Sequence, residues 1–180
     1  MPVYTYVKAS QDDVIKLLEP TYFPTGLPPR VEEVLNPKAK LYVDRSRGLF
    51  SYSAIEGFEE FIEILSNYIV GVAIDPVEAV VKLDLVTVYN DHGYLLEKGK
   101  RVVIIEARGK GVYPLINEGS EVAKGDRVFY IVTGKHEVRV VRSPIDGVLL
   151  VISELIPSEI QVFRAVLVNR DELVMLKRVR

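Results

Sequence analysis

Hydrophobic residues recur at helical spacing in the segment from about Ser53 to Tyr68. Its apolar positions are Ile55, Phe58, Ile62 and Leu65, and its glutamates are Glu56, Glu59, Glu60 and Glu63. Apolar residues three or four apart share one side of a helix, so the pattern predicts an amphipathic helix with an acidic face. That face is either solvated or docks a basic partner. Four glutamates in one environment do not form the contrasting pair that general acid–base chemistry needs.

Shorter elements are expected in the rest of the first 80 residues. Ser10 is placed to cap a helix that runs to Leu18, where Pro20 follows. Prolines and a glycine predict a loop from Tyr22 to Pro29, and a further helical turn over Arg30 to Leu35. Short strands are expected at Leu41 to Asp44 and at Leu49 to Tyr52. Together these elements predict an N-terminal α/β region.

After Val77 the hydrophobic pattern changes to the alternation that is typical of strands. The expected strands are Val80 to Tyr89, Arg101 to Ala107, Gly111 to Ile116, Arg127 to Val132, Glu137 to Arg142, Gly147 to Ile152 and Ala165 to Val168. Asn90 to Gly93 is expected to form a hairpin turn after the first of them. Asp91 beside His92 could be a ligand or an acid–base pair, but the turn geometry already accounts for the residue types found there.

The β-rich part contains an internal repeat. Residues 111–118 align without gaps on residues 147–154, at a separation of 36 residues, and the register continues from Ile131-Val132 to Leu167-Val168. A β unit that is repeated once predicts two interlocking halves related by a pseudo-twofold axis.

Residues of about 105–168 resemble the biotinyl/lipoyl domain. The resemblance rests on Gly111-Val112, Asn117 to Val122, Ala123 to Asp126, Val128 to Val132, Lys135 and Ser143 to Gly147. It implies a barrel-sandwich hybrid, in which two quasi-symmetric halves interlock and a lysine projects from an exposed hairpin tip. The whole chain also resembles an uncharacterised archaeal family of unknown function.

The resulting fold class is α+β. We expect an N-terminal α/β region at residues 1–80 and a β domain at residues 81–180, with the barrel-sandwich hybrid core at about 105–168. Charge changes at the same place: the first 80 residues carry seven Lys and Arg against twelve Asp and Glu, net −5, and the remainder carries sixteen against thirteen, net +3.

The resemblance makes Lys135 the candidate attachment point for a cofactor. Counting forward from Gly125 places Lys135 at the lysine that carriers modify, whereas counting back from Gly147 places His136 there. Biotin domains normally flank this lysine with methionines and lipoyl domains usually place Asp before it, and neither signature is present here. We therefore expect an unmodified tip and no cofactor; biotin or lipoate on Lys135 is the alternative.

Composition removes several classes of site. No cysteine is present, so disulfides, thiolate nucleophiles and cysteine-ligated metals are excluded, and two histidines predict no metal site. A net charge of −2 lacks the basic footprint of a nucleic-acid binder. No apolar stretch reaches the roughly 20 residues that span a membrane, and no signal peptide is recognised, so we expect a cytoplasmic protein. The absence of cysteine and the scarcity of Asn and Gln are typical of thermophiles.

No catalytic residue emerges from the sequence, because dinucleotide, Walker, nucleophile-elbow and HExxH motifs are all missing. The leading hypothesis is a noncatalytic binding or adaptor module with a protein partner; partner and oligomeric state stay open. One alternative is a covalent cofactor or acyl carrier that uses Lys135. Another is an enzyme with a site between the two halves, where Tyr22, Phe23 and Arg30 of the proline-rich loop would line a cleft.

Overall fold

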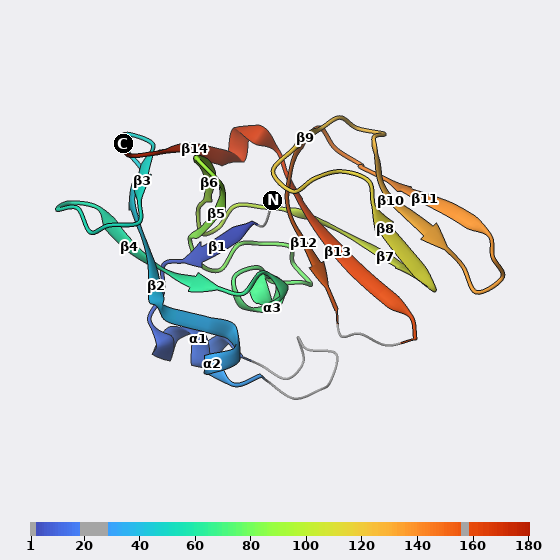
Figure 1. Ribbon diagram of the computed structural model, residues 1–180, viewed down its shortest axis with the longest axis horizontal. Helices are drawn as coiled ribbons and strands as arrows, with labels where there is room; N and C mark the ends of the chain where they lie inside the picture. Colours follow the sequence, from blue (N-terminus) through green and yellow to red (C-terminus); the bar gives the residue numbers. More distant parts are fainter. Residues whose placement is uncertain (1–2, 19–28, 156–158) are drawn as a thin grey trace. The chain divides into compact units, whose positions relative to one another are not determined.

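A computed structural model describes residues 3–18, 29–155 and 159–180 (Figure 1). Contacts divide the chain into two compact units, each described by itself below. Met1–Arg101 and Asp171–Arg180 form the first, here called the barrel unit, and Val102–Arg170 form the second, the two-sheet unit. This is a division by spatial contact, so the domains expected at 1–80 and 81–180 stay predictions.

The barrel unit contains a closed barrel with the strand order β1-β4-β2-β3-β14-β6-β5. Its strands are β1 (Tyr4–Val7), β2 (Leu35–Asp44), β3 (Leu49–Ser51), β4 (Glu59–Ile64), β5 (Leu85–Tyr89), β6 (His92–Leu96) and β14 (Leu173–Arg178). The last strand of the chain runs antiparallel to β6 and parallel to β3, so it closes a barrel that the first 101 residues leave open.

Alternation along these strands fills the barrel with apolar side chains, because successive residues of a strand point to opposite faces. The buried cluster consists of Tyr6, Leu41, Val43, Phe50, Phe61, Val86, Val88, Leu95 and Leu176. Every strand of the barrel contributes at least one of them, and all are at most 6% exposed. A small barrel of this kind is packed and encloses no channel.

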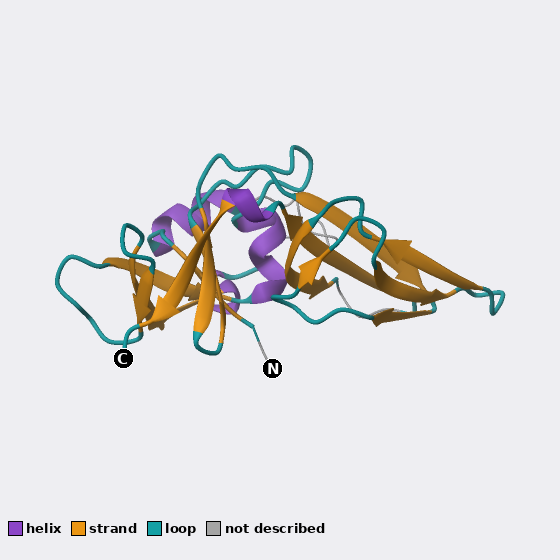
Figure 2. Ribbon diagram, turned by 90° about the horizontal axis from the view of Figure 1, so that it is seen from above, coloured by secondary structure: helices purple, strands orange, loops and turns teal. Residues whose placement is uncertain are grey.

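Helices are short and few among the described residues (Figure 2). They are α1 (Gln11–Leu17), α2 (Val31–Val34) and α3 (Ile69–Val72), with 3-10 turns at Ser66–Tyr68 and Arg170–Glu172. The helix expected after Ser10 is confirmed as α1. Its capping box is complete: the Ser10 hydroxyl accepts from the Asp13 N–H at 3.1 Å, and the Asp13 carboxylate accepts from the Ser10 N–H at 3.0 Å.

The amphipathic helix expected over Ser53 to Tyr68 is wrong, because most of that segment is a turn followed by β4. Gly57 has φ +86°, which a helix does not allow. Within β4, Phe61 faces the barrel interior while Ile62 and Ile64 are buried on the other face. A strand with apolar residues on both faces loses its alternation, and its hydrophobic spacing then imitates a helix.

The expected fold class is therefore wrong. The chain is mostly β, and the N-terminal part forms the closed barrel together with β14 instead of an α/β region. The C-terminal segment does not form a barrel of its own: it forms two open sheets. The prediction failed because three strands, β1, β6 and β14, were not recognised, and the strand β4 was taken for a helix.

The two sheets of the second unit have the orders β11-β10-β8 and β7-β13-β12-β9. Their strands are β7 (Val103–Gly109), β8 (Gly111–Pro114), β9 (Glu121–Val122), β10 (Arg127–Val132), β11 (Val138–Arg142), β12 (Gly147–Glu154) and β13 (Gln161–Val168). One buried cluster holds residues of both sheets, among them Val112 and Phe129 of the first and Leu149 and Leu167 of the second. The core of this unit thus lies between its sheets.

The strand order follows the repeat seen in the sequence. A shift of 36 residues moves β8 onto β12, most of β7 onto β11, and Ile131 and Val132 of β10 onto Leu167 and Val168 of β13. Exchanging the matched strands converts the order β11-β10-β8 into β7-β13-β12. Apart from the two-residue β9, each repeat therefore contributes two strands to one sheet and its first strand to the other.

Within the described residues, no helix combines the length and the apolar character that crossing a membrane requires.

Candidate functional site

The two candidate residues of the sequence lie together at the tip of the β10–β11 hairpin. Thr133 N–H donates to the Glu137 carbonyl at 2.9 Å, and His136 N–H donates to the Thr133 carbonyl at 3.0 Å. The Thr133 hydroxyl oxygen also accepts from the Glu137 N–H at 3.1 Å. These bonds enclose Gly134, Lys135 and His136, and His136 takes the left-handed conformation with φ +62°. This is the hairpin loop in which a turn is followed by one left-handed residue.

Lys135 is the middle residue of this loop, and both Lys135 and His136 are exposed. In the described part of the chain, no carboxylate lies within ion-pair distance of the Lys135 amine. The nearest acidic neighbour in the loop, Glu137, lies 3.7 Å from Arg139 instead. The tip presents an amine to solvent, and no described carboxylate orients it for general acid–base chemistry.

A second feature of this hairpin is the apolar outer face of its sheet. Tyr130 lies directly opposite Tyr113 on one side and Val140 on the other, so all three side chains share that face. The centroids of the two tyrosine rings are 6.3 Å apart. Leu115 and Val138 extend the group at either end, and the exposed fractions of the five side chains range from 36% to 55%. We call these five residues the outer apolar face.

Basic residues are frequent in the hairpin that carries the outer apolar face. Within residues 127–142 there are four, Arg127, Lys135, Arg139 and Arg142, against the single acidic Glu137, which gives a net charge of +3. Arg142 is held in place because its Nη1 donates to the Gly125 carbonyl at 2.9 Å. The sheet therefore combines exposed apolar area with positive charge, which is the composition of a surface that accepts an acidic partner.

Sequence reasoning missed this face, although a signal was present. The segment Val138–Arg142 reads Val-Arg-Val-Val-Arg, and strand alternation puts only one of its sides toward the core. Val141 packs against the buried cluster, so Val138 and Val140 have to face outward. Two outward valines on one strand next to an outward tyrosine are the pattern that indicates an interaction surface.

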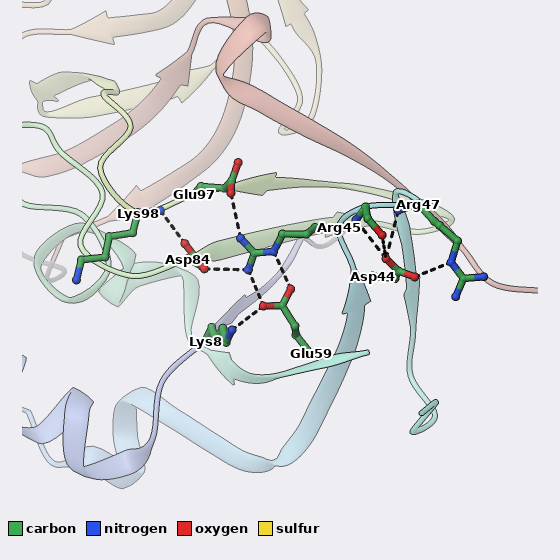
Figure 3. Close-up of polar contacts among 9 residues, drawn as sticks. Lys8, Asp44, Arg45, Arg47, Glu59, Asp84, Glu97 and Lys98 are labelled. Atoms are coloured by element: carbon green, nitrogen blue, oxygen red, sulfur yellow. Dashed lines mark hydrogen bonds and ion pairs between the residues drawn. The ribbon is translucent and has the colours of Figure 1, made fainter. Parts of the chain in front are cut away.

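One end of the barrel carries a charged cluster of a different kind (Figure 3). Arg45 donates to Glu59 at 2.7 and 2.9 Å, to Asp84 at 2.9 Å and to Glu97 at 3.0 Å. Lys8 forms a further ion pair with Glu59. Glu59 is the first residue of β4, and the other four residues lie directly before or after a barrel strand, in step with its inward-facing side chains, so the cluster closes the interior at this end. We call them the barrel-end cluster.

The pKa values in the barrel-end cluster indicate a structural role. Burial by itself would raise the pKa values of Glu59 and Asp84, but hydrogen bonds outweigh it and hold both pKa values below the ordinary range. The bonds come from Arg45 and Lys8 for Glu59, and from the Lys98 N–H and Arg45 for Asp84. A carboxylate that is held ionised by several donors is a poor proton acceptor, so this cluster offers no general base.

The other end of the barrel is aromatic. Tyr6 and Glu63 lie opposite each other on β1 and β4, and burial raises the pKa values of both. The Arg178 guanidinium lies over the Tyr52 ring at 4.9 Å. No carboxylate pair or nucleophile with an adjacent base occurs among these groups, and no cluster of metal-ligating side chains is found in the described residues.

The remaining sequence candidates do not form a site. His92 packs beside Tyr89 and Tyr94 in the β5–β6 hairpin, whose turn at Asn90 and Asp91 is confirmed. Tyr22 and Phe23 lie outside the described residues, so a site that uses them stays a prediction. Arg30 is the N-cap residue of α2. A pocket of about 340 Å³ lies beside α1, α2 and the start of β2, and Glu32 is the only carboxylate among the described residues that line it.

Comparisons with known proteins give a family and one relative. A family model described as "Uncharacterized protein conserved in archaea (DUF2118)" matches residues 33–163. The "Uncharacterized protein MJ0859" of Methanocaldococcus jannaschii is 30% identical over 60 residues, which are 33% of this chain and 37% of that protein. This alignment thus spans little more than a third of the relative. The family model covers most of the chain and includes both the barrel strand β2 and the β10–β11 hairpin, so the chain belongs to this family of archaeal proteins.

Proposed function

We propose that the protein is a noncatalytic binding module that docks a protein partner on the outer apolar face of the sheet β11-β10-β8. The observation that carries this proposal is the continuity of the face: Tyr113, Tyr130 and Val140 are direct neighbours across three strands, and all are exposed. Contiguous exposed apolar side chains inside a polar rim are typical of interaction sites. Tyrosine is also one of the residues that contribute most to binding energy at interfaces.

The state of the ionisable groups supports a noncatalytic role. The carboxylates of the barrel-end cluster form ion pairs with Arg45 and Lys8. Glu118, whose pKa burial raises, accepts a hydrogen bond of 2.7 Å from the Ile152 N–H and so fastens the loop before β9 to β12. These groups hold the fold together, and the proposal assigns them no reaction.

The resemblance to biotinyl/lipoyl domains belongs to the same proposal. Such domains are presented to other proteins, and the exchange of strands between the two repeats supports the likeness. The outer apolar face lies on the hairpin that carries the tip, which is where a partner would recognise such a domain. The fold itself does not establish the function, which rests on the side chains of the face.

Site-specific photocrosslinking tests the proposal. A photoreactive phenylalanine analogue replaces Tyr130, and the matched control carries it at Val77, which is 81% exposed in a turn of the barrel unit. In archaeal cells we expect one discrete crosslinked protein from position 130, none from position 77, and a weaker adduct when Tyr113→Ser is added. Equal crosslinking from both positions, or none from position 130, would contradict the proposal.

A covalent carrier function through Lys135 is the second candidate. It is favoured by one observation: Lys135 is the exposed middle residue of the hairpin loop and has no ion-pair partner among the described residues. Intact-mass analysis and peptide mapping of protein from its own organism test it. A biotinyl, lipoyl or acyl increment on Lys135 that disappears in Lys135→Ala would support a carrier, and an unmodified Lys135 would exclude it.

A further inference from the structure

The sheet β11-β10-β8 has two edges, here called the β8 border and the β11 border. Only the β8 border is protected from pairing with a further strand. At the β8 border, the Val112 N–H donates to the side-chain oxygen of Gln161 at 2.8 Å. Pro114 on the same strand has no N–H to offer. Side-chain capping and proline are ways in which proteins prevent a border strand from pairing. The β8 border is therefore protected.

The β11 border is open along the described residues, since β11 pairs only with β10 (Figure 1). The bond from Thr133 N–H to the Glu137 carbonyl fixes which residues of β11 point their backbone N–H and C=O groups toward β10. Hydrogen bonding alternates along an antiparallel pair, so Arg139 and Val141 exchange bonds with β10. The N–H and C=O groups of Val138 and Val140 therefore point away from the sheet, where a further strand would pair with them.

Charge decides what kind of strand this border accepts. Two copies of the hairpin that paired through β11 would bring two segments of net charge +3 together, which electrostatic repulsion disfavours. An acidic strand would instead meet Arg139, whose only ion pair in the described part of the chain is the loose 3.7 Å contact with the exposed Glu137. The same arginines that discourage self-pairing thus favour an acidic partner.

We propose that an extended acidic segment of the partner protein adds to β11 as a fourth strand of this sheet. This inference rests on the proposed function and specifies the partner's chemistry. Side chains of the added strand alternate between the faces of the sheet. Its apolar residues lie beside Val138 and Val140 on the outer face, and its Asp or Glu residues lie beside Arg139 on the other. The backbone supplies the hydrogen bonds, as in other cases of strand addition.

Binding of short peptides to the full chain tests the inference. The probe is the acetylated, amidated peptide Glu-Val-Glu-Tyr-Glu-Val-Glu, and the control peptide has Lys in place of Glu. We expect the acidic peptide to bind at least about tenfold more tightly, and its affinity to fall as salt is added. Equal affinity of the two peptides would overturn the inference.

Backbone methylation separates strand addition from simple docking of side chains. Every second residue of a strand points its N–H toward a given neighbour. N-methylation of either the glutamates or the apolar residues of the peptide gives two complementary probes. We expect one of them to lose binding and the other to retain it. If both bind like the parent peptide, the peptide does not pair with β11.

A charge-reversed variant supplies the matched protein control. Arg139→Glu should reverse the preference so that the lysine peptide binds better. Arg108→Glu makes the same change in net charge on β7 of the other sheet and should leave the preference unchanged; Arg108 is 64% exposed at its side chain. Reversal by both variants alike would show that only overall charge matters and would overturn the inference.

Hydrogen exchange distinguishes failure of this inference from failure of the proposed function. On addition of the acidic peptide, the amide protons of Val138 and Val140 should become protected. If crosslinking through position 130 occurs but these amides stay unprotected in the crosslinked complex, the binding function stands and strand addition falls. If neither occurs, both proposals fall.

Discussion

Thr5 and Thr87 are direct partners across β1 and β5, and both are buried at 1% exposure, but within the described residues only one of the two hydroxyls has a hydrogen-bond partner. The Thr5 hydroxyl donates to the Ile64 carbonyl, whereas the Thr87 hydroxyl has no partner there. A buried polar group without a partner costs free energy, and a valine has nearly the same shape as threonine without that group.

We therefore expect opposite effects from the same substitution at these neighbouring positions. Thr87→Val should raise the free energy of unfolding by about 0.5–1 kcal/mol, and Thr5→Val should lower it by about 1 kcal/mol. Urea unfolding of the two variants beside the unchanged protein measures both. A loss of stability in Thr87→Val would show that its hydroxyl has a role that the structure does not reveal.

The barrel-end cluster predicts a large effect of removing its central cation. Arg45→Ala leaves Glu59, Asp84 and Glu97 without their shared partner, and it should lower the free energy of unfolding by about 1–3 kcal/mol. Arg47→Ala is the matched control, because the Arg47 side chain is 65% exposed and its ion pair is with Asp44, three residues away in sequence. This control should lose less than about 1 kcal/mol. Equal losses would contradict the structural role of the cluster.

The same cluster predicts how stability depends on pH. The pKa values of Glu59 and Asp84 are lower in the folded protein than in the unfolded chain, so the unfolded state binds more protons in acid. Their contribution is therefore complete above the unfolded pKa of about 4, and it is lost as the pH falls through the folded values. Unfolding measured from pH 6 to 2 should show this fall. Arg45→Ala should show a shallower one, and an unchanged slope would contradict the assignment.

Two glycines of the two-sheet unit predict contrasting costs of an added methyl group. A Cβ at Gly147 would lie 2.2 Å from the backbone oxygen of Val168, which cannot move without disturbing β13. Gly147→Ala should therefore destabilise the protein by at least about 2 kcal/mol. Gly134 has no atom within 4 Å of such a Cβ, so Gly134→Ala should change stability by less than about 1 kcal/mol. Thermal unfolding of both variants compares them.

Adjacent residues of β10 should differ sharply because they face opposite sides of the sheet. Phe129 is fully buried, and Phe129→Ala should cost about 3–5 kcal/mol. Tyr130 lies on the outer apolar face, and Tyr130→Ala should cost less than about 1 kcal/mol while it weakens partner binding. Denaturant unfolding of both variants measures the stability, and the affinity of Tyr130→Ala for the acidic peptide, beside that of the unchanged protein, measures binding. A large loss of stability in Tyr130→Ala would mean that its ring supports the fold and not binding.

Local features of the sequence predicted several elements well. Capping residues marked α1, and strand periodicity between turns marked β10 with its observed bounds, all of β8 and β11, most of β7 and β12, and the second half of β13. The hairpin turn at Asn90 and Asp91 was also recognised. These elements are readable because turn and cap preferences arise from a few neighbouring residues, whatever the rest of the chain does.

Elements defined by distant partners were not recognised. β14 was not recognised as a strand, although Leu176 at its centre is fully buried between β3 and β6. β4 was taken for a helix because its two buried faces imitate helical spacing. In both cases the decisive contacts join residues that are far apart in sequence, and no local pattern encodes them.

For the candidate site, too, the sequence predicted some features and did not predict others. The sequence by itself determined that Lys135 and His136 belong to one hairpin tip, that cysteine chemistry is excluded, and that residues 111–118 and 147–154 are repeated units. Only the tertiary structure decided which side of β10 faces the core, which border of its sheet is closed, and that Arg45 gathers three carboxylates. The reason is physical: alternation tells which residues share a face, but only packing against the rest of the molecule decides which face remains exposed.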